Sequence, residues 1–333
     1  MPEPSLLLFV AVIIVALIYD FSNGLNDAAN AVATVISTRV LSPAAAIGMG
    51  ALLNFTGSMV GLEVARTIGK GIVFPEQITL VTVIGGGLAG AIWVFVATRY
   101  GLPLSVTHSL IGGLVGAGIA TAGLQAIVWH KFIPVLLAIG IAPVLGFFGG
   151  FLLRVALAWI FRHSSPSRVQ RVFGRLQILS AAFMSFSHGR NDAQNSRGIM
   201  LLGLVLYSGQ ASYWDNAPWW VYVLPAVVMM LGTAWGGWRV IETLGVRVTS
   251  LRPVDGFAAE TAAATVIELS SLFGMPVSTT HCITGAIMGS GATRRLSAVR
   301  WGVSRTIVAA WIITIPICGG LGYLFASLLG FLS

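Results

Sequence analysis

The chain has 333 residues, of which 56% are hydrophobic and 9% charged, and its formal net charge is +8. A soluble domain carries about 25% charged residues, so this composition excludes a cytosolic enzyme, a disordered chain and a secreted disulfide scaffold. A polytopic membrane protein remains. The positive charge does not indicate nucleic-acid binding, because most Arg residues flank apolar runs, where they set the orientation of a membrane protein.

The apolar segments, taken in chain order, are separated by short polar stretches, and several have fewer than the about 20 residues that a helix needs to cross a bilayer. Short neighbouring segments are typical of a helix broken near the middle of the membrane, or of a re-entrant hairpin. We therefore expect an all-α polytopic membrane protein with broken helices and re-entrant helical hairpins. The predicted segments are 5–19, 28–38, 44–62, 78–98, 103–121, 132–160, 177–188, 191–208, 217–238, 254–273, 276–292 and 303–332.

The longest polar stretch, 162–176, is rich in Arg and separates a first transmembrane repeat, 1–161, from a second one, 177–333. The positive-inside rule places this basic linker in the cytoplasm, together with the Arg residues that precede the last apolar segment. The N-terminal tail carries Glu3 and no basic side chain. Both chain ends are then predicted outside, and each half must cross the membrane an odd number of times.

Three motifs occur twice, in the same order. Phe21–Asn30 matches Phe186–Asn195 at most positions, with an offset of 165, and Gly101–His108 matches Gly274–His281 at five of eight positions, with an offset of 173. Between them, residues 64–69 resemble residues 240–245. An internal duplication with an odd number of crossings per half predicts two inverted-topology repeats, the plan of many secondary transporters.

The first motif places an Asn-Asp pair, Asn26-Asp27 and Asn191-Asp192, in apolar surroundings. A carboxylate at membrane depth costs about 2.5–3.5 kcal/mol on insertion scales, so it needs a cavity and a cation or proton. Asn side chains and the carbonyl groups of an unwound helix suit Na⁺. The alternative is a hydrogen bond between helices that fixes their packing. The equivalent positions of the two Asp residues favour a cation-coupling site, in which both are Na⁺ ligands if the coupling ion is sodium.

The second motif is Pro-x-Ser-x-Thr-His. Pro103 and Pro276 are expected in the first turn of a helix, and the hydroxyl groups that follow would then lie where free backbone N–H groups meet the positive end of the helix dipole. Two such copies could hold one tetrahedral oxyanion from two sides, although Ser and Thr also cap helices or pack between them. The expected anion-binding residues are Ser105, Thr107, Ser278, Thr279, Thr280, Asn30, Asn195 and Arg190.

Several other polar residues have two open interpretations. His108 and His281 could donate to the anion or carry protons, or could only form structural hydrogen bonds. Arg190 and Arg197 could hold an oxyanion, neutralise Asp192 or reach the membrane interface. For the acidic side chains the choice lies between a proton relay and pairing with a nearby Arg. These acidic residues are Asp20, Glu260 and Glu268.

The chain resembles the inorganic phosphate transporter (PiT) family over nearly its whole length, at segments 24–34, 188–194, 253–261 and 276–281. This resemblance implies an inverted-repeat fold with two helical hairpins and phosphate symport driven by Na⁺ or H⁺. It also implies that Asp27 and Asp192 serve the cation and the hairpin tips serve phosphate. The chain departs from its relatives in having a short basic linker instead of a large central domain, and in Arg190 and residues 195–197.

The sequence thus predicts a plasma (inner) membrane transporter, not an enzyme, that imports inorganic phosphate with Na⁺ or H⁺ by alternating access. It has no expected cofactor other than the transported cation, its partners are phosphate, the cation and the lipid bilayer, and a homo-oligomer is compatible with it. Within the same family the alternative is a sulfate or other tetrahedral-oxyanion symporter. Two further alternatives are an intramembrane hydrolase using Asp and His, and a passive channel.

Overall fold

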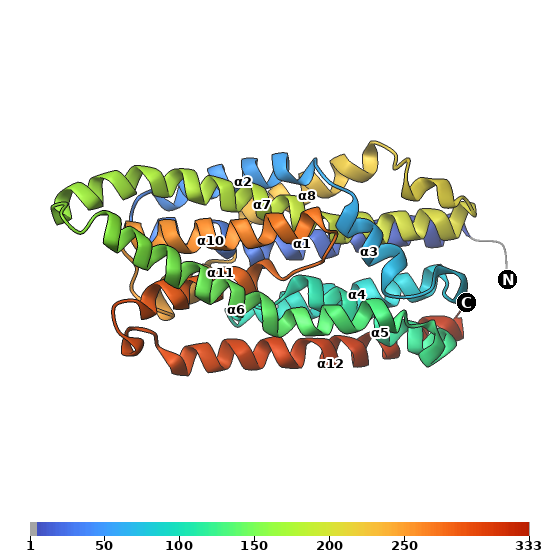
Figure 1. Ribbon diagram of the computed structural model, residues 1–333. Coiled ribbons are helices and arrows are strands. Elements are labelled where there is room, and N and C mark those ends of the chain that lie inside the picture. Colours follow the sequence, from blue (N-terminus) through green and yellow to red (C-terminus); the bar gives the residue numbers. More distant parts are fainter. Residues whose placement is uncertain (1–4, 333) are drawn as a thin grey trace.

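The computed structural model describes residues 5–332, with side chains to Phe331, and Figure 1 shows them as an elongated bundle of helices. Glu3 and Ser333, which belong to the two chain ends predicted outside, are not among the described residues. Within the described range no strand forms, and the predicted all-α class is confirmed. The helices are α1 (Leu6–Ser37), α2 (Pro43–Ser58), α3 (Glu63–Gly71), α4 (Leu80–Arg99), α5 (Val106–Ala122), α6 (Trp129–Ile160), α7 (Pro166–Ser208), α8 (Trp220–Trp235), α9 (Trp238–Glu242), the π-helix η4 (Thr243–Arg247), α10 (Pro253–Leu272), α11 (Thr279–Ala292) and α12 (Trp301–Leu332).

Within residues 5–332, four helices, α1, α4, α6 and α12, are long and apolar enough to cross a membrane, and two bent pairs raise the number to six if each pair is one span. The pairs are α2 with α3, bent by 71°, and α8 with α9–η4, bent by 65°. Broken helices therefore exist, but not at the Asn-Asp motifs. The expected breaks there are wrong, because α1 and α7 run unbroken through both motifs.

The first turns of several helices follow from their capping residues. Ser42 and Ser165 are N-caps followed directly by Pro43 and Pro166, which need no N–H partner in the first turn. Most of the predicted basic linker is consequently the first part of α7 rather than a loop. The expectation for Pro103 and Pro276 is wrong in register: α5 and α11 begin three residues later, at Val106 and Thr279, and the two Pro residues lie in the connections before them.

Helices α4 and α5 form one antiparallel hairpin with its tip at residues 100–105, and α10 and α11 form another with its tip at residues 273–278. In Figure 1 both chain ends lie at one end of the bundle and the α6–α7 turn lies at the other. The α4–α5 hairpin lies towards the end with the chain termini, and the α10–α11 hairpin towards the α6–α7 turn. The two tips therefore approach the middle of the bundle from opposite ends.

The two halves exchange their packing partners in a reciprocal way. Helix α6, the last of the first half, packs on α11 and α10, and α12, the last of the second half, packs on α5 and α4. Helix α1 packs on α8, and α7 packs on α2. Each hairpin is thus covered by the last helix of the opposite half, and the two motif-bearing helices α1 and α7 lie against each other in the centre.

A glycine in each Asn-Asp motif allows these central crossings. A methyl group on Gly24 would lie 3.0 Å from the Thr233 nitrogen and 3.2 Å from the Gly232 Cα atom of α8. A methyl group on Gly189, the equivalent residue of α7, would overlap the backbone of Asn54 in α2. Backbone-to-backbone contact of this kind is how small residues bring membrane helices together. The two close helix crossings place the polar residues of α1 and α7 in the interior of the bundle.

Candidate functional site

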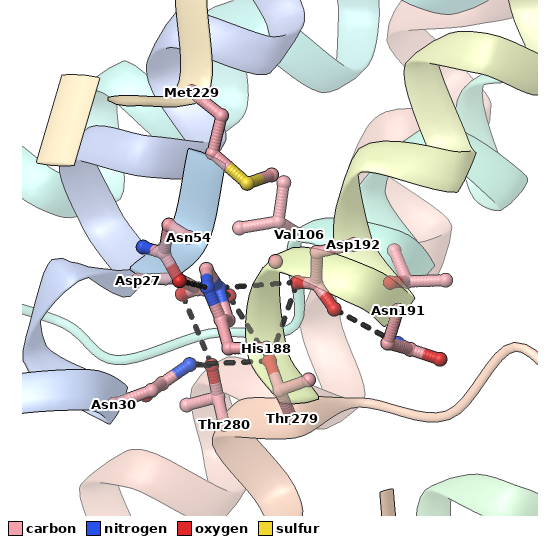
Figure 2. A network of polar contacts seen from close by, with 12 residues as sticks. Asp27, Asn30, Asn54, Val106, His188, Asn191, Asp192, Met229, Thr279 and Thr280 are labelled. Atoms are coloured by element: carbon pink, nitrogen blue, oxygen red, sulfur yellow. Dashed lines mark hydrogen bonds and ion pairs between the residues drawn. The ribbon is translucent and has the colours of Figure 1, made fainter. Parts of the chain in front are cut away.

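The two Asp residues of the repeated motif meet in the centre of the protein. Asp27 of α1 and Asp192 of α7 are each 1% exposed, and His188, one turn before Asp192, is fully buried. The His188 Nε2 atom lies 3.7 Å from Asp27 Oδ2 and 3.5 Å from Asp192 Oδ2, and the ligand atoms of the three residues all lie within 4.8 Å of one another (Figure 2). The other ring nitrogen, Nδ1, is 2.9 Å from Asn54 Oδ1.

The tip of the α10–α11 hairpin bridges the two carboxylates. The Thr279 hydroxyl lies 3.4 Å from Asp27 Oδ2 and 3.2 Å from Asp192 Oδ2, and the Thr280 hydroxyl donates to Asp27 Oδ1 at 3.1 Å. Asn30, one turn beyond Asp27, donates to both hydroxyls, at 3.2 and 2.9 Å (Figure 2). Among the described residues, neither carboxylate has an Arg or Lys ion-pair partner. The centre therefore has two carboxylates and oxygen ligands suited to a small hard cation.

The tip of the α4–α5 hairpin is joined to the second Asn-Asp motif, on α7, by an equivalent hydrogen bond. Asn195 donates to the Thr107 hydroxyl at 2.9 Å, as Asn30 does to that of Thr280. Asn30 and Asn195 are equivalent at the offset of 165, and Thr107 and Thr280 at the offset of 173. Each motif-bearing helix thus holds the hairpin tip of the opposite half.

The first Asn of each motif makes the complementary contact with the hairpin of its own half. Asn26 donates to the Thr98 hydroxyl at 2.8 Å and to the Leu102 carbonyl at 3.3 Å. Asn191 accepts from the Ser271 hydroxyl at 2.9 Å and donates to the Val277 carbonyl at 3.0 Å. Thr98 and Ser271 are again equivalent positions. Asn26 and Asn191, expected as cation ligands, thus both bind the hairpin of their own half through their side chains. Asn191 also donates to Asp192 Oδ1 at 2.8 Å, and the Oδ1 atom of Asn26 has no hydrogen-bond partner among the described residues.

The opening turns of α5 and α11 face each other across the site. Ser105 and Ser278 are their N-caps and accept from the backbone N–H groups of His108 and His281, at 3.1 and 3.2 Å. The two imidazole rings lie 5.1 Å apart between centroids, and both residues are fully buried. Within residues 5–332, neither ring nitrogen of His108 has a hydrogen-bond partner, and the same holds for the Oδ1 atoms of Asn30 and Asn195. These buried polar atoms are free to contact a ligand.

Three of the other predicted residues find protein partners. Arg190 forms an ion pair with Glu268 at 2.5 Å, so its guanidinium group does not reach either Asp. Glu260 is fully buried and accepts hydrogen bonds from Thr34, Ser180 and Gln177, in a cluster of neutral side chains.

The remaining two predicted residues lie together on α7 and α1. Arg197 is fully buried, donates to the carbonyls of Ser58 and Gly61 at the α2–α3 bend, and stacks on Tyr222 with 4.3 Å between its Cζ atom and the ring centroid. Asp20 accepts from the Ser196 hydroxyl at 2.5 Å. Both residues thus form structural contacts, and Arg197 holds the bend between α2 and α3.

Sequence reasoning missed His188 and Asn54. His188 stands where the first copy of the motif has Asn23, and it lies four residues before Asp192, a spacing that puts both on one face of a helix. That signal was available in the sequence. Asn54 carried no such signal, because only the packing of α2 on α7 brings it to the His188 ring.

An all-helical bundle with several apolar helices of membrane-spanning length, some of them bent, is typical of the class of multi-pass membrane proteins. The model of the phosphate transporter family matches residues 23–322. The chain therefore belongs to this family, which comprises transporters and not enzymes.

Two relatives illustrate the match. A protein of Rhizobium meliloti (strain 1021), named "Probable low-affinity inorganic phosphate transporter", is 45% identical over 311 residues, which are 93% of this chain and 92% of that protein. A protein of Bacillus subtilis (strain 168) with the same name is 39% identical and covers 95% of this chain and 96% of its own length. A solved structure, "The sodium-dependent phosphate transporter", is similar with a TM-score of 0.89 and 27% identity, over 98% of this chain and all of that one.

Proposed function

We propose that this protein is a secondary transporter that imports inorganic phosphate together with a cation by alternating access. The observation that carries the proposal is the bridge between Asp27, Asp192 and the hairpin hydroxyls of Thr279 and Thr280. It brings a cation-type site and an anion-type site into contact, which is what coupled transport of the two ions requires.

Charge balance supplies the coupling. Phosphate, like a phosphorylated side chain, carries about one to two negative charges near neutral pH. Two ionised carboxylates beside it cannot stay uncompensated in a buried site. A cation bound at Asp27 and Asp192 therefore favours phosphate binding, and phosphate favours cation binding to the same extent. Transport of one ion then depends on the other.

Phosphate would occupy the space between the two opening turns. Backbone N–H groups and the positive dipole ends of α5 and α11 converge there, together with Thr107, Thr279 and Thr280. The neighbouring His108 and His281 rings would add potential donors to this site. Arg190 does not take part, because it is held by Glu268.

We assign Na⁺ as the coupling cation. The carboxylate, hydroxyl and amide oxygens around Asp27 and Asp192 are hard ligands of the kind that alkali cations bind. The sodium dependence named for the similar solved structure supports this choice. Proton coupling is the competing outcome, and a pH gradient imposed without Na⁺ tests it.

The orientation of the protein in the membrane follows from the predicted topology. The basic start of α7 lies at the end of the bundle opposite to both termini, which fits a cytoplasmic linker and outside chain ends (Figure 1). The two hairpins that enter from opposite ends support two inverted repeats, and alternate movement of the halves would expose the site to each side of the plasma membrane.

The test is phosphate uptake into proteoliposomes with and without an inward Na⁺ gradient. Accumulation that requires the gradient is expected, and equilibration without accumulation would indicate a passive channel instead. Sulfate added in excess should leave uptake unchanged. Strong competition by sulfate would instead favour the other oxyanion as the substrate.

The Asp27→Asn variant is the matched mutational test. Asn keeps the size of the side chain and can still accept from Thr280, but it removes one of the two charges that hold the cation. Gradient-driven uptake should fall to the background, with normal amounts of protein in the membrane. Wild-type accumulation by Asp27→Asn would contradict the assigned site.

A further inference from the structure

Two short elements hold the two hairpin tips by the same hydrogen bond. The Thr67 hydroxyl of α3 donates to the Gly274 carbonyl at 2.8 Å, and the Thr243 hydroxyl of η4 donates to the Gly101 carbonyl at 2.8 Å. Thr67 and Thr243 are the equivalent residues of the third repeated motif, and Gly101 and Gly274 are equivalent in the second. Each bond links an element of one half to the hairpin of the other half.

The surroundings of the two bonds also correspond. Each Thr contacts the carbonyl four residues before it, that of Glu63 at 3.3 Å and that of Arg239 at 3.0 Å. Both glycines have positive φ, +65° for Gly274 and +69° for Gly101. A methyl group on Gly274 would lie 3.2 Å from the Glu63 carbonyl oxygen, and one on Gly101 would lie 3.1 Å from the Arg239 carbonyl oxygen. The tips must therefore be glycine both to turn and to approach the Thr-bearing element.

The two bonds lie on opposite sides of the proposed phosphate site. Gly274 precedes the site residues Ser278 and Thr279 by four and five residues, and α3 covers this tip from the end where the chain termini lie (Figure 1). Gly101 precedes Ser105 in the same way. The η4 element that covers Gly101 packs on the last turns of α1, which run away from the termini.

We propose that Thr67 and Thr243 are positioning residues for transport. Each Thr holds one hairpin tip by its hydrogen bond and so acts as a latch. Release of one latch at a time opens the site to one side of the membrane or the other. The proposal rests on the alternating-access function proposed above. With both bonds formed, Asp27 and Asp192 are shut off from both ends of the bundle, in accord with their 1% exposure. Release of the Thr67 latch opens a path from the site to the end of the bundle with the termini. Release of the Thr243 latch opens a path to the end with the α6–α7 turn.

The two latches differ in what reinforces them. The hairpin held by Thr67 is also tied to α7 by the ion pair between Arg190 and Glu268, whose side chains are 18% and 16% exposed. In the first half the equivalent positions are Leu25 and Phe95, which cannot form such a pair. There, Arg239 donates to the Arg99 carbonyl at 2.6 Å at the end of α4 instead. The side closed by Thr67 thus has the additional charged contact.

The experiment places one reporter cysteine three residues after each latched glycine, at Val277→Cys or Leu104→Cys, in a background with Cys282→Ala and Cys318→Ala. Both reporter positions are buried, at 6% and 0% exposure. A membrane-impermeant thiol reagent is applied to intact cells and to inside-out vesicles. Thr67→Val should raise the modification rate of the Val277→Cys reporter in intact cells by about fivefold, the size expected for one lost hydrogen bond, without raising that of the Leu104→Cys reporter. Thr243→Val should do the reverse in inside-out vesicles.

The conservative variants Thr67→Ser and Thr243→Ser keep the hydroxyl group and should label like the wild type. The proposal is overturned if either Val variant raises labelling of both reporters equally, because Thr would then only support the fold, or if neither variant changes labelling. Phosphate uptake by the wild type in the same cells is read separately. Side-specific labelling without any uptake would refute the proposed transport function and leave the latches standing.

Discussion

At the scale of single residues, the site depends on the two hydroxyl groups by which the second hairpin contacts the buried carboxylates. Thr280 donates to Asp27 and accepts from Asn30, and it stands in the opening turn of α11. Thr279 contacts both carboxylates. The first hairpin has Val106 at the position equivalent to Thr279, so the two repeats are not interchangeable in the centre. The carboxylates are bridged from the second hairpin, and the second hairpin carries more of the chemistry.

Thr280→Val is therefore expected to raise the KM for phosphate more than it lowers the maximal rate. Hydrogen bonds to charged groups contribute about 1.5–3 kcal/mol, so the KM should rise by about 10-fold or more. Thr280→Ser keeps the hydroxyl group and should stay within about threefold of the wild type, within the ordinary scatter of such energies. The initial rate of phosphate uptake as a function of phosphate concentration measures this. An unchanged KM in Thr280→Val would show that Thr280 does not bind phosphate.

Several of these residues could be found from the sequence because they occur twice. The duplication singled out Asp27 and Asp192, and these two meet in the centre. The sequence could not show that Arg190 is occupied by Glu268, since the two lie 78 residues apart and on different helices. Nor did it show that Ser105 and Ser278 spend their hydroxyl groups as N-caps, because the start of a helix depends on tip geometry as well as on the position of Pro.

At the scale of elements, the sequence wrongly predicted that the helices carrying the Asn-Asp motifs, α1 and α7, are broken there. Polar residues in an apolar run look like a break, but Asn and Asp are tolerated inside a helix when their side chains find partners on neighbouring helices. Asn26 and Asn191 find them on the hairpins. The actual bends lie at the α2–α3 and α8–α9 junctions. A glycine with positive φ lies at each bend, Gly61 with φ +93° in the first half and Gly236 with φ +73° in the second. In the first half, Arg197 also binds the carbonyls of Ser58 and Gly61.

The crossing of α7 over α2 gives an element-scale prediction. A methyl group on Gly189 would overlap the Asn54 backbone, so Gly189→Ala must separate the two helices and displace His188 from Asn54. Overpacking of this kind costs about 1–3 kcal/mol. The detergent-solubilised variant should therefore unfold at a lower temperature than the wild type. Gly174→Ala is the control on the same helix, because a methyl group there would contact nothing within 4 Å. Equal melting temperatures for the two variants would contradict a tight crossing.

At the scale of the whole molecule, the arrangement of the two halves is reciprocal rather than side by side. Each half places its last helix on the hairpin of the other, and each motif-bearing helix binds the hairpin tip of the other through Asn30 or Asn195. A site built from both halves cannot form when one half is taken alone. The sequence predicted the duplication from local identity, but the exchange of partners is a long-range property that no local pattern contains.

The same arrangement predicts which surfaces each side of the membrane can reach. Ser167 lies at the start of α7, by the α6–α7 turn, and Gln210 lies just beyond the end of the same helix, which spans the length of the bundle (Figure 1). Both are exposed. In the background with Cys282→Ala and Cys318→Ala, an impermeant thiol reagent should label Gln210→Cys in intact cells and Ser167→Cys only in inside-out vesicles. The basic residues around Ser167 favour the cytoplasm. Labelling of Ser167→Cys in intact cells would show that the protein has the opposite orientation. The Thr67 latch would then close the cytoplasmic side, and the reciprocal packing of the halves would be unaffected.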